Sequence, residues 1–154
     1  MIQRIQTVYL LVVVILIGMF YFLPFASFIL DQDMSVYHIS IKGLIPDIGA
    51  QKPLLRVIPL IFLLSTIIVI SIASILLFKR RMIQIRLCII NIIMLVGLQG
   101  LLYYYIRVSA QQLGSKTSYS FIFVLPVISA ILAYLAIRRI AKDEALVRSA
   151  DRLR

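Results

Sequence analysis

Four long apolar runs, separated by short polar segments, set the pattern of this chain. They cover residues 8–30, 57–78, 83–106 and 119–137. Each run is close to the 20 or so apolar residues that an α-helix needs to cross a bilayer core of ~30 Å. The pattern predicts an all-α membrane protein, in which a bundle of four transmembrane helices forms a single domain over residues 1–154.

Prolines adjust the expected helix ends. Pro24 falls late in the first run and should break or kink the last turn of that helix. The second helix should begin after Pro53, or with Pro59 in its first turn, because a proline at a helix start removes no hydrogen bond. Pro126 lies within the fourth run and should kink the first half of that helix.

The segment 31–52 is the longest polar stretch between runs. Within it, apolar and polar side chains alternate from Met34 to Ile41, as is typical of a β-strand. Gly43 and Pro46 follow and indicate a turn. We therefore expect a short extracytoplasmic strand or hairpin over one mouth of the helices, with the loop 107–117 as its candidate partner.

A basic hinge, Phe78-Lys79-Arg80-Arg81, separates the second and third runs and orients the chain. Short loops rich in Lys and Arg stay in the cytoplasm. With the hinge and both termini inside, the inner segments hold eleven of the 16 basic residues, namely Arg4, Lys79, Arg80, Arg81, Arg86, Arg138, Arg139, Lys142, Arg148, Arg152 and Arg154. The outer loops hold five: Lys42, Lys52, Arg56, Arg107 and Lys116. This predicts a multi-pass protein of a bacterial inner membrane with both termini in the cytoplasm.

Composition agrees with a membrane protein, since 62% of the side chains are hydrophobic, 14% are charged and the mean hydropathy is +1.06. The formal net charge is +10. Because the basic residues cluster beside apolar runs, we assign them to topology and lipid headgroups, foremost Lys79, Arg80, Arg81, Arg138 and Arg139, and not to nucleic acid.

Polar side chains inside the predicted spans are few and neutral. Asn91 and Gln99 lie eight residues apart on the third helix, which we interpret as nearly the same face. Ser65 and Ser71 on the second helix are their candidate partners, because an amide within the bilayer needs a hydrogen bond. The pattern favours helix packing, with a ligand or ion site as the alternative.

The last segment, 138–154, is predicted to be a cytoplasmic amphipathic helix. It carries an apolar stripe and a charged face that includes Glu144, Arg148, Asp151 and Arg152. The helix either lies on the inner leaflet or docks a protein partner. Its acidic residues weaken the lipid interpretation, and both alternatives remain open.

The two ends of the chain carry a resemblance. The opening MIQRIQTVYLL and the closing KDEALVRSADRLR, with four apolar runs between them, resemble the small membrane-protein family of Bacteroidetes called domain of unknown function 4293. The resemblance covers the full length. It implies a four-helix inner-membrane protein and brings no activity, cofactor or functional residue with it.

The spans contain no histidine and no acidic residue, so they offer no nucleophile with a base and no metal-ligand set. We therefore expect no enzyme and no cofactor. The leading hypothesis is an accessory or scaffolding subunit of a membrane complex, whose exposed ends, 3–6 and 143–154, contact a protein partner or a second copy. The alternative is a small transporter or ligand-binding protein that uses Asn91, Gln99, Ser65 and Ser71.

Overall fold

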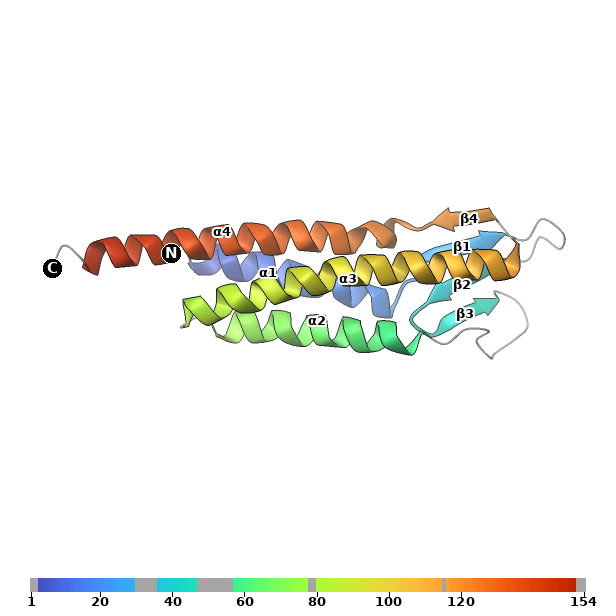
Figure 1. Ribbon diagram of the computed structural model, residues 1–154, viewed down its shortest axis with the longest axis horizontal. Helices are drawn as coiled ribbons and strands as arrows, with labels where there is room; N and C mark the ends of the chain where they lie inside the picture. The colour runs from blue at the N-terminus through green and yellow to red at the C-terminus, as the bar shows by residue number, and fades with distance from the viewer. Residues whose placement is uncertain (1–2, 30–35, 47–56, 78–79, 115, 152–154) are drawn as a thin grey trace.

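Helices make up most of the chain. The computed structural model describes residues 3–29, 36–46, 57–77, 80–114 and 116–151. In these residues four α-helices lie side by side (Figure 1): α1 (Gln3–Gly18), α2 (Ile58–Leu76), α3 (Arg81–Leu113) and α4 (Leu125–Asp151). Each helix packs against two others, so that α1, α2, α3 and α4 form a ring in that order. The predicted mostly helical architecture is confirmed.

Three of the apolar helical segments are long enough to cross a membrane. They are Ile58–Leu76, Arg81–Leu113 and Phe121–Ala145, and each contains a long stretch that is almost entirely apolar. The apolar segment Ile5–Tyr21, which comprises most of α1 and the turn after it, is shorter. Length and composition therefore suit three of the four helices to a bilayer.

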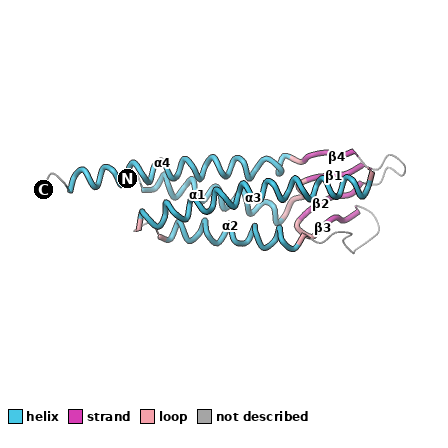
Figure 2. Tube along the Cα trace, in the orientation of Figure 1, coloured by secondary structure: helices cyan, strands magenta, loops and turns pink. Residues whose placement is uncertain are grey.

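A small antiparallel sheet closes one end of the helices (Figure 2), which we call the sheet end. Its strands are β1 (Ala26–Ile29), β2 (Val36–Ser40), β3 (Gly43–Pro46) and β4 (Lys116–Tyr119), in the spatial order β3-β2-β1-β4. The turn between α2 and α3 lies at the opposite end, which we call the hinge end (Figure 1).

The predicted first helix, 8–30, is wrong at its end. The α-helix stops at Gly18, continues as a 3₁₀ turn over Met19–Tyr21, and gives way to β1 after Pro24. Proline cannot donate the hydrogen bond that would continue the helix. The Phe25 N–H bonds the Ile39 carbonyl at 3.0 Å, which joins the chain to β2 as soon as the proline is passed.

The predicted hairpin is present, with different partners. β2 and β3 pair through a tight turn, after which Gly43 has φ 107°, a conformation that favours glycine. The expected partner loop, 107–117, is mostly helix, because α3 extends to Leu113 and ends at Gly114 with φ 58°. The chain after Gly114 supplies β4, which pairs with β1 and not with β2.

The remaining prolines give one confirmed prediction and one correction. Pro59 lies in the first turn of α2, as one of the two predicted alternatives required. The predicted kink at Pro126 is wrong, because α4 begins at Leu125 after a 3₁₀ turn over Phe121–Val124. Pro126 therefore occupies the first turn, where its missing N–H removes no helical bond. α4 then runs without a break past Arg138 to Asp151.

One hydrophobic cluster joins the sheet to the helices. It contains buried side chains of the sheet region and of all four helices, among them Val13, Phe20, Phe25, Phe28, Ile39, Leu44, Leu64, Leu98, Leu102, Ile106 and Leu125. A smaller cluster, Leu10, Cys88, Ala136 and Ile140, packs toward the hinge end. A sheet of such short strands is marginal alone, and its burial against the helices stabilises it.

Candidate functional site

Asn91 and Ser71 form a buried hydrogen bond between α3 and α2. The Asn91 side-chain N–H donates to the Ser71 hydroxyl at 2.8 Å, and that hydroxyl donates in turn to the Ile67 carbonyl at 2.8 Å. Both side chains are at most 1% exposed. Such a bond between helices contributes roughly 0.6 kcal/mol in a membrane. This pair links α2 to α3 within their buried interface.

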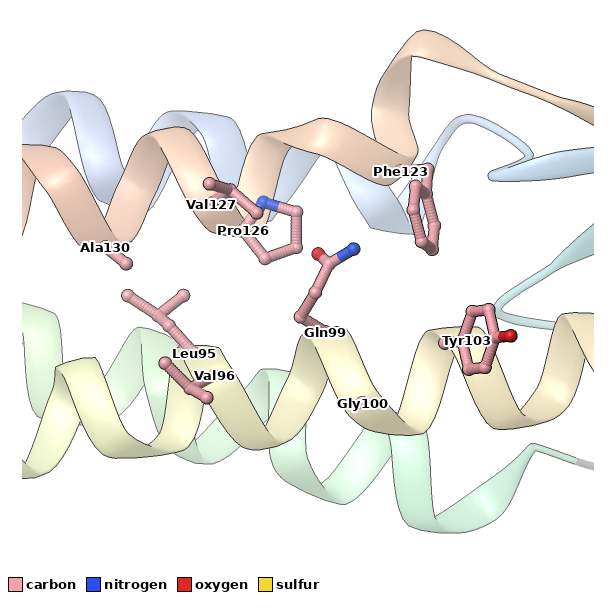
Figure 3. A pocket seen from close by; sticks show the side chains of 9 residues that line it. All are labelled: Leu95, Val96, Gln99, Gly100, Tyr103, Phe123, Pro126, Val127 and Ala130. Carbon is pink, nitrogen blue, oxygen red and sulfur yellow. The ribbon is translucent and has the colours of Figure 1, made fainter.

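Gln99 and Ser65 lie elsewhere. Ser65 bonds the Ile61 carbonyl and the Tyr21 hydroxyl, each at 2.8 Å, at an exposed position on α2. Gln99 points between α3 and α4 (Figure 3). The expectation that Asn91 and Gln99 share a face is therefore wrong: eight residues at 100° each leave about 80° between them, which turns one toward α2 and the other toward α4.

A groove between α3 and α4 surrounds Gln99 (Figure 3). Its volume is about 520 Å³, and its lining is almost entirely apolar: Leu95, Val96, Gln99, Gly100, Tyr103, Phe123, Pro126, Val127 and Ala130. Gly100 widens it, since a side chain added there would meet no atom within 4 Å. Pro126 faces the amide across the groove and has no N–H to offer it.

The Gln99 amide is incompletely paired in this groove. Its Oε1 atom is buried and has no hydrogen-bond partner among the described residues. A buried acceptor without a donor costs about 1–3 kcal/mol. The groove therefore combines an apolar wall with one acceptor that a bound group could satisfy.

A second polar cluster ties three helices together at the hinge end. Gln6 of α1 donates from its side-chain amide to the Asp143 carboxylate of α4, and the two side chains are 7% and 9% exposed. Arg81, the first residue of α3, donates to the Asp143 backbone carbonyl at 3.0 Å. The expectation that Gln6 and Asp143 lie on exposed, partner-binding ends is wrong, because each satisfies the other within the protein.

Sequence reasoning missed this cluster because 137 positions separate its two side chains. One feature of the sequence could have indicated it. Both residues lie where an apolar helix becomes polar, and the first and last helices of a four-helix bundle can be neighbours. A carboxylate at such a boundary needs a donor once it is buried.

Asp143→Ala is expected to lower the free energy of unfolding by about 1–3 kcal/mol, because the buried Gln6 amide loses its acceptor. Asp143→Asn keeps an acceptor oxygen and should cost less than half as much. Thermal unfolding of the two variants in the same detergent measures the difference. Equal losses would show that the hydrogen bond does not hold α1 to α4.

The other predicted site residues that the structure describes lie along the hinge end of the molecule. Arg80, Arg138 and Arg139 are exposed, and Glu144 is half-buried. Arg148 and Asp151 belong to the last turns of α4, whereas Lys79 and Arg152 lie outside the described residues. The structure therefore distributes these residues over the hinge and one helix and does not gather them into one site.

Histidine and acidic side chains form no metal cluster in the described part of the chain. His38 lies in β2, is half-buried, and shares a 2.9 Å hydrogen bond with the Ser27 hydroxyl of β1. The described polar side chains thus include neutral amides and hydroxyls within the helices, together with cations and the paired Asp143 carboxylate at the hinge end.

Comparison with known proteins agrees with the pattern of the two ends. No curated protein matches the chain. The family model described as Domain of unknown function (DUF4293) matches residues 2–153, which cover both end motifs except Met1 and Arg154 and all the described elements of the fold. A match over nearly the whole length shows the family, and this chain belongs to the domain of unknown function 4293 family.

Proposed function

We propose that this protein is a non-enzymatic integral membrane protein of a bacterial inner membrane, which acts as an accessory or scaffolding subunit of a membrane complex. Three long apolar helices support the membrane assignment. Large apolar side chains are exposed along the outer faces of all four helices, among them Val8, Leu11, Ile15, Phe62, Val69, Ile93, Val96, Val127 and Ile131. An apolar surface of this extent is expected against lipid.

The orientation proposed for the chain follows from its charge. The basic residues concentrate at the hinge end, and the positive-inside rule favours the cytoplasm for that end. The sheet then covers the opposite mouth of a four-helix bundle. α3 supports this arrangement: its 33 residues measure about 50 Å, so about 20 Å of the helix projects from a ~30 Å core to reach the sheet.

The observation that carries the scaffolding role is the α3 surface beside the Gln99 groove. Gly97 and Gly100 are exposed on α3, and a side chain at either would meet nothing within 4 Å. These glycines therefore do not allow a close helix contact within one copy of the protein. In a membrane, small residues allow two helices to approach closely, and an apolar helix of a partner subunit is the occupant that this surface fits.

The straight course of α4 supports a partner at the hinge end as well. The helix continues along the axis of the molecule beyond the other three (Figure 1). A helix that continues in this direction projects into the cytoplasm and does not lie flat on the leaflet. Of the two roles expected for the tail, the geometry favours docking a protein.

Site-specific crosslinking tests the proposed docking surface. A photoreactive residue at Val96, on the rim of the groove, is expected to crosslink a partner subunit in membranes. The matched control is Val69 on α2, since both valines are 63% exposed. Gly100→Leu should abolish the Val96 product, because its side chain blocks the close approach of a second helix. A Cβ at this position meets no atom within 4 Å in the single copy, and thermal unfolding of the variant checks that the fold is kept. Equal products from Val96 and Val69 would contradict the proposal.

Ligand binding is the second candidate function, and the unpaired Gln99 carbonyl favours it. The groove volume of about 520 Å³ falls within the range of roughly 300–1,000 Å³ found for small-molecule sites. An amphipathic molecule with a hydroxyl or amide donor would satisfy Gln99. In that case mass spectrometry of the purified protein should detect a bound compound that Gln99→Leu removes, while crosslinking from Val96 yields no partner.

A further inference from the structure

A basic cleft lies between α1 and α4, toward the hinge end. Its volume is about 320 Å³, and its lining consists of Tyr9 on α1 with Leu135, Arg138, Arg139 and Lys142 on α4. The four α4 residues follow the i, i+3, i+4 and i+7 spacing, which places them on one face over two turns. Three cations therefore converge on one concave site together with a phenol.

No hydrogen bond or ion pair from the described residues neutralises the positive charge of this cleft. Arg138, Arg139 and Lys142 are exposed, and none makes a hydrogen bond or ion pair with another described residue. In the described part of the chain no carboxylate lines the cleft. Asp143, the next residue along α4, is buried, and its carboxylate accepts a hydrogen bond from Gln6. The cleft is thus left with unpaired donors for an anion.

The cleft stands where the apolar surface of α4 ends. Val127, Ile131 and Tyr134 are exposed along one side of the helix, and Arg138 follows them at the same spacing. Leu135 and the ring of Tyr9 add apolar surface to the lining of the cleft. A ligand with an oxyanion at one end and hydrocarbon at the other would match both parts.

We propose that this cleft binds the phosphate group of an anionic phospholipid. Arginine forks donate paired hydrogen bonds to phosphate oxygens, and lysine adds a compact positive charge. The Tyr9 hydroxyl supplies a further donor, while the acyl chains follow the apolar stripe of α4 toward the bilayer centre. Basic pockets between helices at a membrane surface are suited to acidic headgroups. This site is separate from the α3 docking surface and does not depend on the proposed partner.

Native mass spectrometry of the full-length protein in detergent tests the site with phosphatidylglycerol as the probe and phosphatidylcholine as the zwitterionic reference. One phosphatidylglycerol is expected to remain bound at least tenfold more tightly than phosphatidylcholine. Arg138→Gln, Arg139→Gln and Lys142→Gln together should weaken its binding by more than tenfold. The matched control removes three exposed cations elsewhere, through Lys42→Gln, Arg86→Gln and Arg107→Gln, and should change binding less than twofold.

A conservative variant and a competition experiment complete the test. Tyr9→Phe removes one donor without a charge change and should weaken phosphatidylglycerol several-fold, so the site remains testable if the triple variant fails to fold. Inorganic phosphate at millimolar concentration should compete only weakly, because it lacks the acyl chains. Strong competition by phosphate would overturn the lipid assignment in favour of a soluble phosphate. Equal losses in the cleft and control variants would overturn the site itself.

Discussion

Phe28→Ala is expected to destabilise the whole molecule by about 3–5 kcal/mol. Phe28 lies on β1 between β2 and β4, opposite Tyr37 and Thr117, and is 0% exposed. It belongs to the hydrophobic cluster that joins the sheet to the helices. Removing the ring leaves a cavity at that junction, so the sheet and the helices should lose stability together, as a single lower transition in thermal unfolding followed by circular dichroism.

Phe22→Ala is the matched control for this prediction. Phe22 is 86% exposed and precedes Pro24 on the same segment of chain. An exposed side chain away from special features contributes within about 0.5 kcal/mol. If both alanine variants unfold alike, or if only the sheet melts in Phe28→Ala while the helices keep their midpoint, the sheet is an independent appendage and does not stabilise the helical body.

The strand that contains Phe28 is the reason why the sequence alone misplaces the end of the first helix. Residues 8–30 form one apolar run, and hydrophobicity cannot distinguish a membrane span from a helix followed by a short buried strand. Pro24 marks the boundary, and the strand after it is visible only from its partners. Those partners, Ile39 and Tyr119 opposite Ala26, lie in two distant parts of the chain.

Helix existence was predictable, whereas helix ends depended on local chemistry. The apolar runs identify α2, α3 and α4, because each is long and nearly uncharged. The extra length of α3 beyond residue 106 was hidden, since polar residues such as Gln111 and Gln112 fit a loop or an exposed helix equally well. Gly114, with its left-handed conformation, is the signal that ends the helix.

The sequence could identify residues of the candidate sites, but it could not predict how they are arranged in space. The need of Asn91 for a hydroxyl on the neighbouring helix was inferred from its chemistry, and the structure brings it to Ser71. The direction of Gln99 required the rotation of α3 and the position of α4, neither of which a local pattern defines. The Gln6 and Asp143 bond and the basic cleft arise from the contact of α1 with α4, which joins the two ends of the sequence.

The hinge carries the second prediction with a large effect. Replacing Lys79, Arg80 and Arg81 with glutamine is expected to give a mixed population of membrane orientations. Eight basic residues would remain on the segments proposed to lie inside, against five outside. Much of that remainder lies in the segment 138–154, which is synthesised last. Helix insertion responds to charges beside the spans. The hinge should therefore influence the membrane orientation before the C-terminal segment is synthesised and can correct it.

The structure provides controls that separate topology from stability. Arg81 also donates to the Asp143 carbonyl, whereas Arg80 is exposed. Arg81→Gln alone should therefore cost about 1 kcal/mol of stability and leave orientation unchanged. The triple change of Arg148, Arg152 and Arg154 to glutamine removes the same number of charges from the tail and should also leave orientation unchanged.

Cysteine accessibility in intact cells measures the orientation directly. Cys88 is buried and can be replaced by alanine, and a new cysteine at Gln112 would stand exposed at the sheet end of α3. An impermeant thiol reagent should label this cysteine fully in the parent and in both controls, but only partially in the hinge variant, because a fraction of its molecules would present the sheet end to the cytoplasm. Full labelling of the hinge variant would mean that the apolar helices and the other charges orient the protein without it. The role of the hinge would then be reduced to the contact between Arg81 and α4.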